Sequence, residues 1–219
     1  MGGGYVSKEK FVSQDGGPLN CYHAVAPISR PDLDIDWIYA GNIPAYRSIL
    51  DWLKIRDVGM IISLTIEKLK VGRNINHVPF DFDNTEWIDS DIEEKDLSDF
   101  VIEHIPIADA YYPIPIYAEK LLQIVSEYRQ NYPHKKIYFH CWVGGGRTCT
   151  AVVYILMKLY NLSLEEAQTL VHNQYDKFKL KPAQLAFLEG DKPSPADIIN
   201  SEPDIKTPTG HKCYDSRAS

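Results

Sequence analysis

The residues best suited to do chemistry stand together between positions 140 and 148. Cys141 can act as a nucleophile, and Arg147, six residues later, has a planar guanidinium that binds two phosphate oxygens at once. Three consecutive glycines lie between them, and glycine allows successive N–H groups to face one concave space. A thiol beneath such a cradle suits attack on a phosphate ester. The motif comprises His140, Cys141, Trp142, Val143, Gly144, Gly145, Gly146, Arg147 and Thr148.

The segments on either side of the motif predict how it is held. Residues 136–139 are typical of a strand and residues 150–160 of a helix. A helix N-terminus carries about half a positive elementary charge and several unpaired N–H groups. Cysteines in such places ionise with a pKa of about 3.5–7.5, against about 8.5 for a free thiol. We therefore expect Cys141 to be a thiolate at neutral pH.

Other side chains in the motif can support this chemistry. The backbone of residues 142–146 would bind the substrate phosphate together with Arg147. Thr148 can donate its hydroxyl to the thiolate, and His140 can fix the loop through its ring nitrogens. Trp142 is bulky for a loop, and either packs beneath it or lines the substrate pocket. The competing interpretation is a buried cysteine before a glycine-rich turn, with the arginine in a surface ion pair.

Composition limits the classes of protein that need considering. The chain has 219 residues, 44% of them hydrophobic, and a net charge of −7, which suits a globular domain and disfavours nucleic acid as a partner. No apolar run is long enough to cross a bilayer, and the first twenty residues contain no secretory signal. The four cysteines show no zinc-site spacing. We expect a cytoplasmic or nuclear protein without a metal.

The hydrophobic pattern predicts an α/β fold with a mostly parallel sheet and helices on both faces, because strands alternate with helices. In such sheets ligands bind at the carboxyl ends of the strands, where Cys141 falls. Gly41 should end the first strand. We expect strands at 37–40, 60–64, 101–107 and 136–139. We expect helices at 46–53, 117–128, 150–160 and 182–188, and one that begins at a capping box at 163–166.

The chain divides into three parts. Residues 1–30 read as an irregular lead-in, residues 31–190 as the catalytic domain and residues 191–219 as a flexible tail. Within the domain, residues 81–103 hold ten acidic side chains and a single base, Lys95. Runs of charge are usually solvated, so we expect this insert to be a surface loop.

The motif resembles the signature loop of the cysteine-dependent protein tyrosine phosphatases, most closely that of the small, atypical dual-specificity phosphatases. Residues 37–64 resemble the opening strand, helix and strand of that family, and residues 103–113 resemble its acid loop. The resemblance covers about residues 35–190. It implies the tyrosine phosphatase fold, with the signature loop between a strand and a helix, and a reaction that needs no metal or cofactor.

The resemblance also implies roles for individual residues. Cys141 attacks phosphorus and forms a phosphocysteine, while Arg147 and the loop amides bind the equatorial oxygens. An aspartic acid upstream protonates the departing oxygen and then activates water, a proton transfer worth about 10²–10⁴ in rate. Asp109, in the acid-loop segment, is our candidate. Asp81 and Asp83 remain rivals because they also follow a short apolar run.

Two departures from the family pattern need an explanation. Cys149 stands where the family usually has glycine, and is either a small core residue or a thiol that captures an oxidised Cys141 as a disulfide. Gln184 lies in a segment where related enzymes place a polar residue that positions water, although a glutamine on a helix surface is the simpler interpretation.

Three hypotheses about the substrate share this nucleophile. The first is a phosphatase for phosphotyrosine in proteins, and also for phosphoserine and phosphothreonine. The second is the same chemistry on an inositol phosphate, a phosphoinositide or an RNA 5′-phosphate. The motif supplies no lysine for such polyanions, although Lys177, Lys179 and Lys181 form a basic cluster further on. The third is a phosphoprotein-binding module without turnover.

Overall fold

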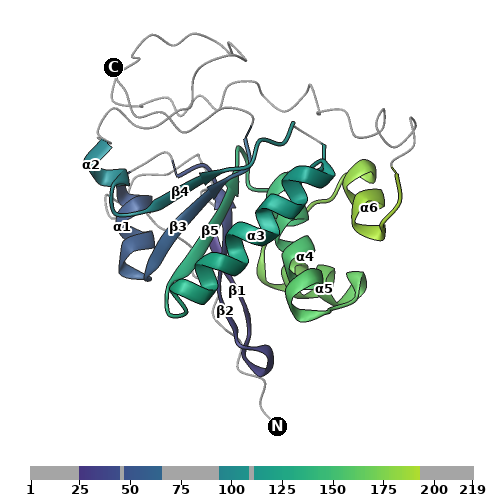
Figure 1. Cartoon of the computed structure of the whole chain (residues 1–219), viewed down its shortest axis with the longest axis horizontal. Coiled ribbons are helices and arrows are strands. Elements are labelled where there is room, and N and C mark those ends of the chain that lie inside the picture. The colour runs from purple at the N-terminus through teal and green to yellow at the C-terminus, as the bar shows by residue number, and fades with distance from the viewer. Residues whose placement is uncertain (1–24, 45–46, 66–93, 109–110, 193–219) are drawn as a thin grey trace, which may run out of the picture.

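A mixed five-stranded sheet forms the centre of the protein. The computed structural model describes residues 25–44, 47–65, 94–108 and 111–192. The strand order is β1-β2-β5-β3-β4, with β1 antiparallel to β2 and all other neighbours parallel (Figure 1). This confirms the expected α/β class and the mostly parallel sheet. The strands are β1 (Val25–Arg30), β2 (Ile35–Asn42), β3 (Val58–Ser63), β4 (Val101–His104) and β5 (Lys136–Cys141).

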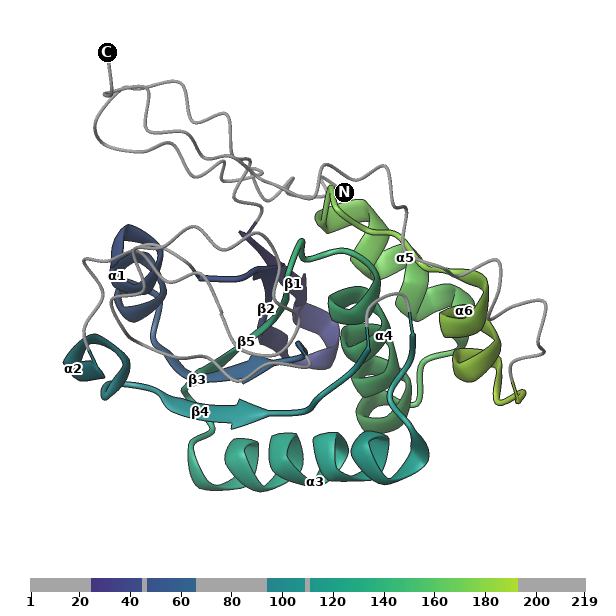
Figure 2. The same ribbon diagram turned by 90° about the horizontal axis from the view of Figure 1, so that it is seen from above.

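Helices cover both faces of this sheet (Figure 2). A short 3₁₀ turn (Pro31–Leu33) joins the first two strands. The smaller layer holds α1 (Arg47–Ile55) and α2 (Glu94–Leu97), and the larger layer holds α3 (Pro115–Asn131), α4 (Gly146–Tyr160), α5 (Leu164–Gln174) and α6 (Pro182–Glu189).

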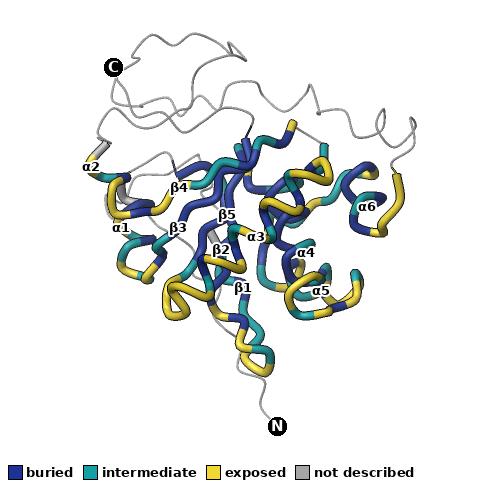
Figure 3. Tube along the Cα trace, viewed as in Figure 1, coloured by how far each residue is buried: buried dark blue, intermediate teal, exposed yellow. Residues whose placement is uncertain are grey.

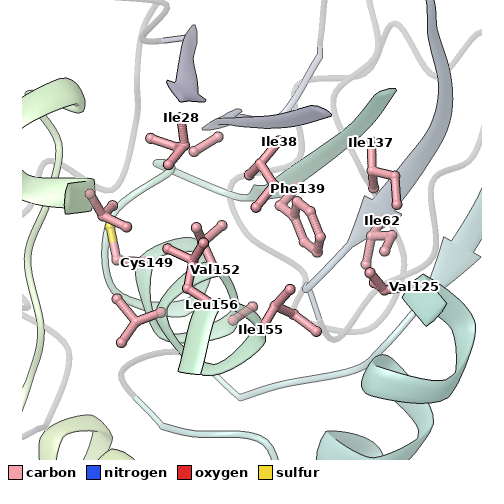
Figure 4. Close-up of a cluster of buried hydrophobic side chains, with 14 of the residues drawn as sticks. Ile28, Ile38, Ile62, Val125, Ile137, Phe139, Cys149, Val152, Ile155 and Leu156 are labelled. Atoms are coloured by element: carbon pink, nitrogen blue, oxygen red, sulfur yellow. The ribbon is translucent and has the colours of Figure 1, made fainter. Parts of the chain in front are cut away.

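Alternation along the central strands explains the two layers. On β5, Ile137 and Phe139 belong to the large cluster under α3 and α4, whereas Tyr138 belongs to the smaller cluster under α1. Successive strand residues point to opposite faces, and a parallel strand covered on both sides must be apolar throughout. Figure 3 shows this strand buried along its length. Figure 4 shows Phe139 facing Val152 and Ile155 of α4.

The structure corrects several details of the sequence-based prediction. The strand expected at 101–107 ends at His104. The end of the expected irregular lead-in, residues 25–30, forms β1. Its Pro27 made a strand hard to predict, but β1 is an edge strand, where proline removes no hydrogen bond from the sheet. Gly41 does not end β2, which continues to Asn42. Residues 1–24 lie outside the described residues.

The helices that follow the cysteine-bearing strand were predicted well. Most residues in the first half of α4 are buried, as suits a helix packed on several sides. The capping box that opens α5 is present, since Ser163 accepts the N–H of Glu166 at 3.3 Å and donates its own N–H to that carboxylate at 2.9 Å. Helix α6 forms where expected. These helices hold the start of α4 in a fixed place.

Only the end of the acidic insert is described. Residues 94–103 form α2 and the start of β4, and Leu97 and Phe100 bury themselves beside α1. Lys54 of α1 pairs with Asp99 at 2.8 Å. Residues 81–93 and the tail from residue 193 onward lie outside the described residues. Within the part of the chain that is described, no helix is both long and apolar enough to cross a membrane.

Candidate active site

Cys141 stands at the carboxyl end of the central strand. β5 lies between β2 and β3, so the loop that follows it is surrounded by the ends of neighbouring strands. The side chain is buried, with 3% of its surface exposed. Its Sγ accepts the backbone N–H of Gly144 at 3.3 Å. The loop therefore folds back over the sulfur, as the cradle interpretation requires.

The fold of this loop depends on Gly144. Its φ is +84°, in the left-handed region that side chains disfavour. A Cβ there would lie 2.7 Å from the carbonyl carbon of Gly41 and 2.8 Å from the nitrogen of Asn42, and would also meet the Tyr175 hydroxyl. Both backbone angle and space require glycine. The N–H that reaches the sulfur is thus fixed by the packing of the loop against β2.

Arg147 lies in the first turn of α4 and is only 6% exposed. Its Nη1 donates to the carbonyl oxygen of Ile107 at 3.1 Å. Because Ile107 belongs to the segment that resembles the acid loop, this bond joins that segment to the signature loop. The predicted phosphate ligand is therefore held between the two pieces of the expected site.

The remaining loop residues are anchored to β2 and its extension. The Trp142 carbonyl accepts the N–H of Ile43 at 3.3 Å, and the indole is half-buried. Thr148 is buried and donates its hydroxyl to the Gly41 carbonyl at 3.4 Å, so in this structure the hydroxyl fixes the start of α4. Val143 is 38% exposed and forms the outer part of the loop.

His140 is completely buried beside Cys141. Nδ1 donates to the Cys141 carbonyl at 3.4 Å, and the ring stacks on Tyr138 with 5.9 Å between centroids. Burial, the nearby positive charge of Arg147 and the charge of His104 lower the pKa of His140 to about 3, although the backbone hydrogen bond opposes this. The ring is therefore neutral at physiological pH and supports the loop without adding charge.

Two tyrosines under the loop escaped the sequence analysis. Tyr138 on β5 and Tyr175 after α5 are buried, and burial first, then the charge of neighbouring groups including Cys141, raises the pKa of each. Tyr175 lies against Gly144, and its hydroxyl has no hydrogen-bond partner among the described residues. Nothing in the local sequence identifies Tyr175, because its proximity arises only when α5 folds back.

Cys149 lies in the hydrophobic core rather than in the cradle (Figure 4). It is fully buried. Desolvation raises the pKa of its thiol to about 12, although a backbone hydrogen bond from Lys179 lowers it. A protonated, inaccessible thiol is a poor nucleophile, which favours the core interpretation over the redox one.

The segment that resembles the acid loop crosses the carboxyl ends of the strands. The Ile105 N–H donates to the Ser63 carbonyl at 2.9 Å and the Tyr111 N–H to the Ala108 carbonyl at 3.1 Å. Asp109 itself lies outside the described residues, as do its rivals Asp81 and Asp83. The described neighbours nevertheless bring the chain on both sides of position 109 to the signature loop.

Gln184 is not the surface glutamine that its helix suggested. It is completely buried, its Nε2 donates to the Tyr111 carbonyl at 2.8 Å and its Oε1 accepts the Lys181 N–H at 2.9 Å. A Cβ on Gly146 would lie 2.7 Å from Oε1, so the amide packs flat against the signature loop. Among the residues that the structure describes, no cluster of three metal-ligating side chains occurs.

Solved structures that are similar to this chain include protein tyrosine phosphatases and dual specificity phosphatases. The chain is similar to Tk-PTP in its active form, with 25% identity and a TM-score of 0.51 over 70% of this chain and 89% of that one. It is similar to PTPMT1 in complex with PI(5)P, with 17% identity, a TM-score of 0.53 and coverage of 70% and 88%. It is also similar to a mouse putative dual specificity phosphatase complexed with zinc tungstate, with 12% identity and a TM-score of 0.55 over 83% of this chain and 91% of that one.

These likenesses confirm the predicted fold, including a cysteine loop between a strand and a helix. They also support cysteine-based phosphatase chemistry. No protein-family model matches the sequence, and no curated protein matches it.

Proposed function

We propose that this chain, which has the fold of the cysteine-dependent protein tyrosine phosphatases, hydrolyses phosphate monoesters through a phosphocysteine. Its preferred substrates are proteins that carry phosphotyrosine, with phosphoserine and phosphothreonine as further ones. The observation that carries the proposal is the covered sulfur of Cys141, which accepts the Gly144 N–H inside a loop closed by Arg147. This arrangement supports the proposal that Cys141 acts as the nucleophile and Arg147 as a phosphate ligand on one substrate.

In the first step the Cys141 thiolate attacks phosphorus opposite the ester oxygen. A sulfur–phosphorus bond forms, the phosphorus–oxygen bond breaks, and its electron pair goes to the departing oxygen. The Asp109 carboxylic acid gives that oxygen its proton and becomes a carboxylate. General acid catalysis of this kind is worth about 10²–10⁴ in rate. An alkoxide leaving group depends on this proton more than an aryl oxide does, because the alkoxide is the stronger base.

In the second step water attacks the phosphocysteine. The Asp109 carboxylate takes a proton from the water, a phosphorus–oxygen bond forms, and the sulfur–phosphorus bond breaks with its electron pair returning to Cys141. Inorganic phosphate leaves and both groups regain their starting states. Neither step consumes a cofactor.

The signature loop lowers the activation barrier by stabilising the negative charge on the equatorial phosphate oxygens. The N–H groups at the start of α4 have no helical acceptor, and Arg147 adds two parallel donors. Preorganised donors of this kind are worth about 10²–10³ each in turnover. The loop is already folded around the sulfur, so the main rearrangement when phosphate enters is that Arg147 exchanges its bond to the Ile107 carbonyl for bonds to phosphate.

A second candidate, a polyanionic substrate such as an inositol phosphate, a phosphoinositide or an RNA 5′-phosphate, is favoured by one feature. The segment at 177–181, which carries the basic cluster, borders the signature loop through its backbone. A Cβ on Gly145 would lie 3.4 Å from the carbonyl oxygen of Lys177, and the backbone of Lys179 hydrogen-bonds the Cys149 thiol. PTPMT1, a structural neighbour, was crystallised with PI(5)P. A binding module without turnover is the third candidate.

One assay series separates these candidates. We expect the protein to hydrolyse an aryl phosphate, Cys141→Ser to abolish turnover and Cys149→Ala, a matched change at a core cysteine, to preserve it. Phosphate release from phosphotyrosine, phosphoserine and phosphothreonine peptides should then exceed release from inositol phosphates, phosphoinositides and 5′-triphosphorylated RNA. A parent protein that binds phosphopeptides without turnover is a binding module, and this result would refute the proposal.

A further inference from the structure

Helix α6 touches both parts of the proposed site. Gln184 of α6 bonds the backbone of Tyr111 in the acid-loop segment and packs against Gly146 at the start of α4. Phe187, one turn further along, stacks on Tyr112 with 5.4 Å between ring centroids. It also packs at a tilt against Tyr154 of α4, with 5.5 Å between ring centroids. The helix therefore braces the segment that follows position 109 against the helix that carries Arg147.

The amide of Gln184 can hold the acid-loop segment because both its oxygen and its nitrogen form hydrogen bonds. Oε1 accepts from the backbone of Lys181, which fixes the amide plane at the start of α6. Nε2 is then directed to the Tyr111 carbonyl at 2.8 Å. The side chain is fully buried, so loss of the amide would leave the Tyr111 carbonyl without this donor.

The acid-loop segment is thereby held at two carbonyls on either side of the proposed acid. Arg147 donates to the carbonyl of Ile107, two residues before position 109, and Gln184 to that of Tyr111, two residues after it. Arg147 is also the proposed phosphate ligand, so its bond to Ile107 competes with substrate. Gln184 has no such second task and can hold the segment throughout the reaction.

We propose that Gln184 is a positioning residue for the general acid, acting through the Tyr111 carbonyl rather than by orienting the hydrolytic water. The inference rests on the proposed function. Since Asp109 is the acid of the first step and the base of the second, loss of Gln184 should slow both steps. Only the loss in the first step should depend on the leaving group, and it should be larger for a leaving group that needs a proton. A residue that only orients water would affect the second step alone.

The test compares two esters in the full chain with Gln184→Met, which keeps the length of the side chain and removes the amide. Gln174→Met is the matched control, because Gln174 also bridges backbone atoms: it accepts from the Ser29 N–H and donates to the Ser29 carbonyl, both at 2.8 Å, at β1. We expect Gln184→Met to lower kcat/KM, which reports the first step alone, about tenfold or more on phenyl phosphate, a fraction of the 10²–10⁴ from the acid. The loss on 2,4-dinitrophenyl phosphate, whose leaving group needs no proton, should be about threefold or less.

Three outcomes would overturn the inference. Equal losses on both esters would indicate a purely structural role, and no loss on either would indicate no role. A pre-steady-state burst followed by slow turnover, with kcat/KM on phenyl phosphate unchanged, would indicate a defect confined to the water step. Activity of the parent on dinitrophenyl phosphate tests the proposed function separately from these comparisons.

A second measurement needs no substrate. Amide hydrogen exchange in the peptide covering residues 105–117 should become faster in Gln184→Met than in the parent and should stay unchanged in Gln174→Met. Vanadate affinity, which measures phosphate-analogue binding by the signature loop, should change less than about threefold because no donor to phosphate is removed. Unchanged exchange in residues 105–117 would contradict the proposed brace.

Discussion

Replacing Gly144 with alanine tests whether the packing of the signature loop sets the chemistry. The left-handed φ of +84° costs an L-residue about 1–2 kcal/mol. The new Cβ would also lie 2.7 Å and 2.8 Å from backbone atoms of β2, which cannot yield as a flexible side chain does. Overpacking of this kind costs about 1–3 kcal/mol. The expected loss of unfolding free energy is therefore about 2–5 kcal/mol, the sum of these two contributions.

Gly190 is a matched control for the backbone angle. Its φ is +86°, and a Cβ there would meet nothing within 4 Å. Gly190→Ala should therefore show only the angular cost of about 1–2 kcal/mol, with normal turnover. In Gly144→Ala the loop must move, and a shift of about 1 Å at a reacting group can cost about 10²-fold in rate.

The assay combines urea unfolding of both variants with aryl phosphate turnover under native conditions. We expect Gly144→Ala to lose about 1–3 kcal/mol more than Gly190→Ala, the overpacking cost alone, and to lose most of its activity. Equal stability and equal turnover in the two variants would show that the loop adapts freely, and would refute the argument that steric fit fixes the donor to Cys141.

Three further predictions concern individual groups. Asp109→Asn should lower turnover of alkyl phosphates by about 10²–10⁴ and leave vanadate binding nearly intact, and larger losses in Asp81→Asn or Asp83→Asn would assign the acid elsewhere. Since the pKa of His140 falls from 6.5 to about 3 in the fold, only the unfolded chain takes up its proton between those pH values. Acid should thus cost about 1.4 kcal/mol per pH unit in that window, and urea unfolding of His140→Asn should show a shallower pH slope. Mild peroxide should yield sulfenic and sulfinic acid on Cys141 by mass spectrometry; a Cys141–Cys149 disulfide would contradict the inert character of the buried Cys149 thiol.

The sequence was most informative where local pattern and chemistry coincide. β5, the signature loop and α4 were predictable because an apolar run, a glycine-rich turn and a helical run are consecutive. The same holds for α5, whose capping box is a local signal. β1 was missed because Pro27 disrupts its pattern, and an edge strand can tolerate what a central strand cannot.

What the sequence could not predict are contacts between distant segments. Gln184 looked like a surface residue of a short helix, and only the return of α6 to the acid-loop segment buries it. Tyr175 comes under Gly144 for the same reason. The bond from Arg147 to Ile107 joins residues 40 positions apart. Such contacts are set by topology, which periodicity does not specify.

Rapid acid quenching of the protein during turnover of an aryl phosphate, followed by mass spectrometry of its peptides, tests the central claim most directly. Our account predicts one phosphoryl group on the peptide that contains Cys141, and its absence from Cys141→Ser. Steady turnover with no phosphorylated cysteine peptide, or with the phosphoryl group on another residue, would contradict it.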